Sequence, residues 1–145
     1  TLHTNTAVGA MTRLRDMGVE PFLLSSSVTG VLAQRLVRML CTECRRAYEP
    51  TDTDRGLLGA YEPLSIFEPG GCASCSGTGY KGRTGVFELV RIDEHMRGLI
   101  HDGAAESALE SYARTLTPSL LADSQRLVAN GVTSIAELRR VTHST

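Results

Sequence analysis

The sequence lacks tryptophan, is poor in aromatic residues and has no long apolar run. Aromatic side chains make up 5% of its 145 residues, so an extended base-stacking surface for single-stranded nucleic acid is not expected. No stretch approaches the roughly 20 apolar residues that cross a bilayer. A formal net charge of −1 gives no global attraction to nucleic acid or to an anionic membrane. We therefore expect a cytosolic protein.

The chain also lacks a recognisable leader. Its first residues, TLHTNTA, resemble the interior of a folded unit rather than a flexible lead-in, so we expect the chain to be part of a longer protein with further motifs upstream. A chain of 145 residues is long enough for one modest core, or for a small core with a satellite module.

The cysteines are few, but all four fall into two C-x-x-C pairs, Cys41 with Cys44 and Cys72 with Cys75. Zn²⁺ favours four tetrahedral thiolates, and each C-x-x-C turn presents two sulfurs to one ion. The pairs are separated by 27 residues, more than the roughly 15–20 of a short zinc ribbon. The pattern predicts one structural zinc site with these four ligands, and some structure in the segment between the pairs.

Other interpretations of the cysteines are buried free thiols, two disulfides and a redox dithiol. A cytosolic protein disfavours disulfides, and a thioredoxin-like site needs only one C-x-x-C pair. Four thiolates around Zn²⁺ would leave a net charge of −2, which needs nearby donors or cations. Basic residues that flank the pairs are expected to supply them, namely Arg38, Arg45, Arg46, Lys81 and Arg83.

The second pair lies in the stretch CASCSGTGY, where Gly77 and Gly79 follow the cysteines. Glycine can adopt positive φ, so we expect these residues to turn backbone N–H groups toward sulfur. The stretch also fits the repeat of J-domain cochaperones. That family carries four such repeats, whereas CTECRRAY at the first pair lacks both glycines, so this interpretation is disfavoured.

The spacing of apolar and capping residues predicts several helices and a few strands. A helix is expected over 6–17 with Thr4 or Asn5 as its N-cap, and another from Asp93 to Gly103 with Asp93 as its N-cap. Ser134 and Glu137 have the spacing of a capping box. Further elements are expected as a helix from Pro21, a short helix near Leu57, a strand near Ile66, a strand after Gly82 and Gly85 that ends near Ile92, and helices over 106–116, 119–129 and 134–141. The segment VLAQRLVRML is ambiguous between helix and strand.

Several stretches together resemble one family. These are TLHTNTAVGAMTRLRDMGVEPFLLSSSVTGVLAQRLVRMLC, the second C-x-x-C pair and GYKGRTGVFELV, which are similar to the C-terminal part of the bacterial ATPases of type II secretion and type IV pilus assembly. The resemblance covers nearly the whole chain and implies an α/β fold. It also implies that the ambiguous segment, from Gly30 through Arg38, is a strand and that GRTGVFELV is its neighbour. It implies the end of a RecA-like ATPase core over 1–40, an inserted four-cysteine zinc module over 41–80, a returning core strand over 81–92 and a helical subdomain over 93–145.

The family works as a hexameric ATP-hydrolysing motor beneath the cytoplasmic membrane. The resemblance therefore implies other hexamer subunits as partners, together with cytoplasmic and inner-membrane components of the secretion or pilus machinery, and no nucleic acid. It also implies that ATP and Mg²⁺ bind only in the full-length protein. The sequence contains no GxxxxGK[ST] loop to hold the phosphates, so this chain alone is not expected to hydrolyse ATP.

Two residues receive candidate roles from the resemblance. Thr1-Leu-His-Thr4 matches the end of the family's histidine box, which places His3 near the terminal phosphate, where an imidazole can orient γ-phosphate or water by hydrogen bonding. A structural role at a strand end is the alternative for His3. Arg35 is a candidate contact at the core surface or nucleotide site, and an ion-paired or solvated arginine is the alternative.

A nucleic-acid-binding zinc ribbon is the rival function. The window RLVRMLCTECRR contains four arginines, which could neutralise phosphates and make binding salt-dependent. The same arginines are expected to offset the charge of the thiolates. The segment between the cysteine pairs is acidic, with Glu49, Asp52, Asp54, Glu62 and Glu68. The motor function is therefore favoured.

Overall fold

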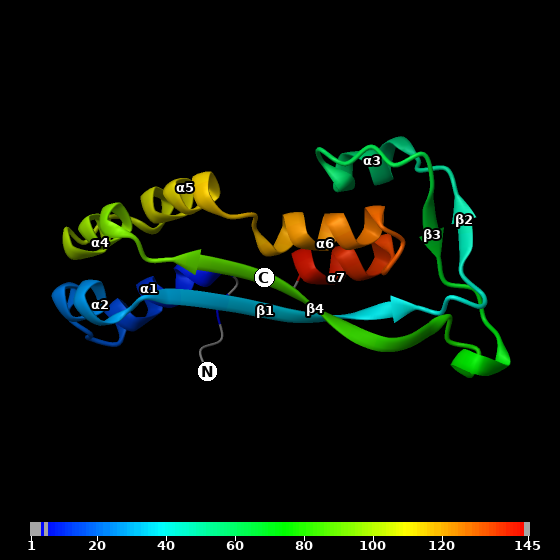
Figure 1. Ribbon diagram of the computed structural model, residues 1–145, viewed down its shortest axis with the longest axis horizontal. Helices are drawn as coiled ribbons and strands as arrows, with labels where there is room; N and C mark the ends of the chain where they lie inside the picture. The colour runs from blue at the N-terminus through cyan, green and yellow to red at the C-terminus, as the bar shows by residue number, and fades with distance from the viewer. Residues whose placement is uncertain (1–3, 5, 144–145) are drawn as a thin grey trace. The chain divides into compact units, whose positions relative to one another are not determined.

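The computed structural model describes Thr4 and residues 6–143, which form a mixed α/β fold. The expected fold class is confirmed at this level, with helices at the C-terminal end of the chain (Figure 1). In chain order the elements are α1 (Ala7–Asp16), α2 (Pro21–Ser27), β1 (Gly30–Leu40), β2 (Arg46–Tyr48), α3 (Asp52–Leu58), β3 (Ile66–Glu68), a 3₁₀ turn (Ala73–Cys75), β4 (Tyr80–Arg91), α4 (Glu94–His101), α5 (Glu106–Leu116), α6 (Leu120–Ala129) and α7 (Ile135–His143). No helix within the described residues combines the length and apolar character needed to cross a bilayer.

The strands form two separate two-stranded sheets, β1 with β4 and β2 with β3. The β1–β4 arrows run antiparallel in Figure 1, and backbone bonds flank the pairing at both ends, from Cys41 N to Gly79 O and from Ile92 N to Thr29 O. The ambiguous segment before Cys41 is thus a strand. β4 begins at Tyr80, earlier than expected, because the strand runs through Gly82 and Gly85 instead of starting after them.

The chain divides into two compact units. The first unit combines residues 1–34 with residues 87–119, and the second combines residues 35–86 with residues 120–145. β1 and β4 each contribute residues to both units. The helices after Asp93 are shared as well, with α4 and α5 in the first unit and α6 and α7 in the second.

The first unit is built around apolar side chains of four helices and the sheet. α2 packs against α4, and α5 packs against α1 and α4. The fully or nearly buried members of this core are Ala7, Val8, Met11, Leu24, Val90, Ile92, Met96, Ile100, Leu109 and Ala113. Of the apolar residues that recur every third position in α1, Val8 and Met11 are buried in this core, whereas Met17 beyond its end is 64% exposed.

Capping explains where two of these helices begin. The N-cap of α1 is Thr6, whose Oγ1 accepts a hydrogen bond from Gly9 N at 2.9 Å, so the expected caps Thr4 and Asn5 were wrong. Asp93 caps α4 as predicted, because its carboxylate accepts from Met96 N at 2.9 Å. A side-chain oxygen at the N-cap satisfies one of the orphan N–H groups of the first turn.

The second unit has an apolar cluster of its own. Its buried apolar cluster comprises Leu58, Ile66, Val128, Ile135 and Leu138. Leu58 and Ile66 come from the segment between the cysteine pairs, whereas the other three residues come from α6, α7 or the residues next to them. The segment between the pairs is therefore held by apolar packing against α6 and α7 as well as by its cysteines.

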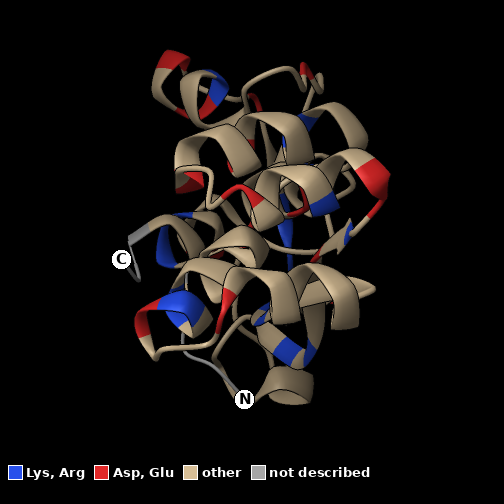
Figure 2. Ribbon diagram, turned by 90° about the vertical axis from the view of Figure 1, so that its left-hand side faces the viewer, with Lys and Arg blue, Asp and Glu red and all other residues tan. Residues whose placement is uncertain are grey.

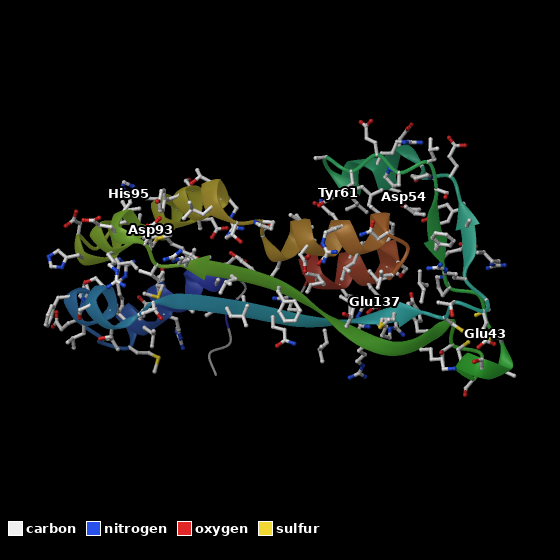
Figure 3. The ribbon with its side chains drawn as sticks, in the orientation of Figure 1. Glu43, Asp54, Tyr61, Asp93, His95 and Glu137 are labelled. Atoms are coloured by element: carbon white, nitrogen blue, oxygen red, sulfur yellow. The ribbon has the colours of Figure 1, made fainter. Side chains whose placement is uncertain are left out.

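The capping box expected at Ser134 and Glu137 forms only in part. Ser134 Oγ accepts from Glu137 N at 3.4 Å, a long bond. The Glu137 carboxylate instead accepts from Arg38 on β1, from its backbone N–H at 2.8 Å and from its guanidinium at 2.8 and 3.0 Å. Glu137 thus ties α7 to β1 rather than closing its own helix (Figure 3).

Candidate metal centre

The four cysteines converge at one point of the second unit, where Cys41 meets Cys72 and Cys44 meets Cys75, each across 31 positions of sequence. Their Sγ atoms all lie within 4.8 Å of one another. Individual Sγ–Sγ distances are 3.8 Å for Cys41 and Cys72, 3.7 Å for Cys44 and Cys75, and 3.7 Å for Cys72 and Cys75. Four sulfurs at about 2.3 Å from a tetrahedral Zn²⁺ would lie about 3.8 Å apart. The donor set and its spacing therefore fit one zinc ion.

These sulfurs are free thiols rather than disulfides. The first pair follows directly from β1, and its turn is closed by a bond from Arg45 N to Cys41 O at 2.9 Å. The second pair spans the 3₁₀ turn, in which Gly77 N donates to Cys72 O at 2.9 Å. A backbone bond from Cys41 N to Gly79 O at 2.9 Å joins the first turn to the chain that follows the second. We call the two cysteine turns, residues 41–44 and 72–75, the knuckles.

Backbone N–H groups point at one of the sulfurs. Cys75 Sγ accepts from Cys72 N at 3.4 Å and from Gly79 N at 3.2 Å. The φ of Gly79 is 75°, and a Cβ there would lie 2.5 Å from Pro69 Cβ, so the position requires glycine. The expected orientation toward sulfur is confirmed at Gly79, whereas Gly77 uses its N–H for the turn carbonyl.

The hydrogen bonds divide the thiols into unequal groups. The Cys72 backbone N–H lowers the pKa of Cys75 to about 6; burial opposes this change and the Gly79 N–H adds to it. Desolvation raises the pKa of Cys44 to about 12, and hydrogen bonds with the other three thiols add to that increase. The N–H groups of Cys72 and Gly79 thus favour the thiolate form of Cys75, the form that coordinates metal.

Most of the basic residues expected to offset the thiolate charge also have protein partners. Arg38 bonds to Glu137, and its guanidinium lies 4.1 Å from the centre of the Tyr80 ring. Arg45 donates to Gly131 O and stacks on Phe67 at 4.3 Å. Arg46 pairs with Glu68 at 3.2 Å, and Lys81 donates to Ser74 Oγ. The stacked and paired arginines hold protein groups together, which lends no support to a phosphate-binding stripe.

Acidic and basic residues are interspersed along the ribbon in the view of Figure 2, in keeping with the formal net charge of −1.

The other two candidate residues have different outcomes. Arg35 donates from Nη1 to Val141 O near the C-terminal end of α7 at 2.8 Å, a favourable position for a cation, so a structural role is part of what it does. His3 lies outside the described residues, and its role near a phosphate stays a prediction.

Sequence reasoning missed the contacts that connect the knuckles to the rest of the second unit. Tyr80, close after the second pair, forms a hydroxyl hydrogen bond with Ser134 Oγ at 2.8 Å. Arg38 reaches Glu137 across 99 positions of sequence. No local periodicity or spacing signals such contacts, because they depend on the path of the chain between the two residues.

Comparison with known proteins identifies the family that this sequence matches. Residues 1–140 match the family model described as type II/IV secretion system protein. The chain is 52% identical over 144 residues to a type II secretion system ATPase E of Vibrio cholerae and 51% identical over 144 residues to a type II secretion system protein E of Pseudomonas aeruginosa. In both cases the match covers 98% of this chain and 29% of the relative. The chain thus spans less than a third of the length of these relatives.

Proposed function

Because the chain belongs to the family of type II/IV secretion system proteins, we propose that it is the C-terminal part of an ATPase motor that powers type II protein secretion. Identity of about half the residues over nearly the whole chain to proteins named for that system supports this assignment. Type IV pilus assembly is the related process that the same motor architecture would serve. ATP hydrolysis, with Mg²⁺, is proposed for the full-length protein alone.

The observation that carries the proposal is the convergence of two distant cysteine pairs within a chain of this family. Cys41, Cys44, Cys72 and Cys75 are proposed to hold one structural zinc ion. Four sulfurs saturate a tetrahedral ion and leave no open position for water or substrate. The role of the metal is therefore to stabilise the fold and to present the surrounding lobe to partners, and not to take part in hydrolysis.

The proposed organisation follows the family resemblance. Residues 1–40 end a RecA-like ATPase core, residues 41–80 form the zinc module, residues 81–92 return to the core, and residues 93–145 form the helical subdomain. His3 is proposed to help position the terminal phosphate or the attacking water. The motor is proposed to act as a hexamer on the cytoplasmic side of the inner membrane, with the zinc module contacting cytoplasmic or membrane-embedded components of the machinery.

The metal is tested first. Elemental analysis of reduced, freshly purified chain is expected to find one zinc per molecule, released when four equivalents of an organomercurial reagent titrate the thiols. Absence of stoichiometric metal would contradict the zinc site, whereas it would leave the family assignment unchanged.

The motor function is tested in the full-length protein. Replacing Cys72→Ser is expected to reduce secretion strongly while nucleotide binding falls little, because the zinc module is proposed to lie apart from the phosphate site. Secretion is measured in cells whose chromosomal copy is deleted, and nucleotide binding is measured with a fluorescent ATP analogue on purified protein. Equal loss of secretion and nucleotide binding would argue against a separate structural module.

A further inference from the structure

The tips of the two knuckles are joined by side chains. Glu43 lies between the cysteines of the first knuckle, and Ser74 lies between those of the second. Ser74 Oγ donates to Glu43 Oε1 at 2.6 Å, and Lys81 Nζ at the start of β4 donates to Ser74 Oγ at 2.9 Å. Figure 3 marks Glu43 at this end of the ribbon. These three residues form what we call the knuckle clasp.

The clasp complements the backbone contact between the knuckles. The bond from Cys41 N to Gly79 O ties the first cysteine to the chain that follows the second knuckle. The bond between Ser74 and Glu43 adds a second connection, at the middle of each cysteine turn. With both in place, movement of either pair of sulfurs away from the other requires two hydrogen bonds to break.

Lys81, the third residue of the clasp, carries a positive charge that suits a site of negative charge. Lys81 is the only lysine among the 15 lysine and arginine residues of the sequence. An ammonium group is a compact charge with three donors on a flexible stem, whereas a guanidinium is a planar fork suited to carboxylates and rings. Arg38 and Arg45 are used in that second way, against Glu137 and Phe67. Lys81 thus adds a positive charge beside the knuckle whose sulfurs would share the net −2 of a zinc tetrathiolate.

We propose that Glu43, Ser74 and Lys81 act as positioning residues that hold the two knuckles together and slow the loss of zinc. The inference rests on the proposed function, since it assumes that the four cysteines bind the ion. Zinc leaves only when sulfurs separate from it, so a bond between the two ligand turns opposes the first opening step. Contacts around the ligands of metal sites commonly influence metal affinity for this reason.

The alternative is that these exposed contacts are incidental. Solvent-exposed polar pairs often contribute nothing measurable to stability. A single retained hydrogen bond corresponds to an effect of about 2- to 10-fold on a rate or an equilibrium. The two cases therefore differ by an amount that a kinetic measurement resolves.

The experiment measures zinc release from the zinc-loaded chain into excess chelator, followed with a metal-binding dye. Ser74→Ala and Glu43→Ala are each expected to release zinc about 2 to 10 times faster than the unmodified chain. The double variant is expected to release zinc no faster than Ser74→Ala alone, because Ser74→Ala already removes the bond to Glu43. Thr42→Ala, an exposed change within the first knuckle, is the matched control and is expected to leave the rate unchanged.

Each outcome bears on one proposal. If the unmodified chain binds no zinc, the proposed metal site fails. If it binds one equivalent but the Ser74 and Glu43 variants release it at the unmodified rate, the clasp is wrong and the metal site stands. Additive effects in the double variant would also overturn the clasp, since they would exclude a shared bond. Lys81→Met is expected to speed release at low salt, and an unchanged rate would remove Lys81 from the clasp.

Discussion

The two units of the chain are stabilised by different kinds of contact. The first unit has a core of ten buried apolar residues, contributed by α1, α2, α4, α5 and the sheet. The second unit has a connected apolar cluster of five residues and further buried apolar side chains, among them Leu40, Val86 and Leu127, and beside them lie the thiol cluster and the buried Glu137 with its arginine. A structural metal commonly supplements apolar packing in small modules. The comparison teaches that one connected apolar core holds the first unit, whereas the second combines apolar packing with a buried ion pair and a candidate metal centre.

The largest effect is expected from breaking the metal centre. In Cys75→Ser the ion is lost, and because structural zinc contributes on the order of 10 kcal/mol in small zinc modules, the second unit should lose protection while the first unit keeps it. The loss should include α6 and α7, since Leu58 and Ile66 share a core with Val128 and Leu138. Hydrogen exchange resolved by peptide measures this.

Ser65→Ala, an exposed change between the knuckles, serves as the control for that experiment. Retained protection of α6 and α7 in the Cys75 variant would show that apolar packing alone holds the second unit. The contrast between the units would then not depend on the metal.

A matched pair of core substitutions sharpens the contrast. Leu109→Ala in the first unit and Leu138→Ala in the second each remove a fully buried side chain, and each should cost about 2–5 kcal/mol in its own unit. Only Leu138→Ala should also speed zinc release, because its core packs against the segment between the knuckles. Denaturant unfolding and zinc release are measured on both proteins. Equal zinc release from the two variants would contradict the separation of the units.

A smaller effect is expected at Glu137. Burial alone would raise the pKa of this carboxyl group, but hydrogen bonds from the Arg38 side chain and backbone and from Arg140 outweigh burial and hold the pKa below its ordinary value. A lowered pKa in the folded state stabilises the fold above the ordinary value of 4.5, and the stabilisation is lost as pH falls through the folded-state pKa.

Glu137→Gln should therefore lower the unfolding free energy of the second unit at pH 7 by about 1–3 kcal/mol. It should also flatten the loss of stability that the unmodified protein shows below pH 4.5. Denaturant unfolding between pH 3 and pH 7 measures both, with the exposed Glu62→Gln as control. If Glu137→Gln lost stability between pH 7 and pH 3 as steeply as the unmodified protein, protonation of Glu137 would not be a cause of that loss.

Local signals predicted the elements well where the stabilising contact is short in sequence. Asp93 caps the helix that follows it, and the glycine after the second cysteine pair turns its N–H toward sulfur. The predicted capping box failed because a distant residue competes with the local partner for the same carboxylate. Ser134 and Glu137 have capping-box spacing, but Arg38 takes the carboxylate because a buried carboxylate gains more from a guanidinium and a backbone N–H than from its own N-cap.

The sequence by itself determined the identities and spacing of the candidate metal ligands, the helical and extended segments and the family resemblance, because these depend on residues close together in the chain. Only the tertiary structure decided which helices share a core, which arginines are occupied by protein partners and that Ser74 meets Glu43 between the knuckles. Such contacts depend on the path of the backbone between residues that are distant in sequence. Many different paths are compatible with the same local pattern, and packing and hydrogen bonding across the whole unit select one of them.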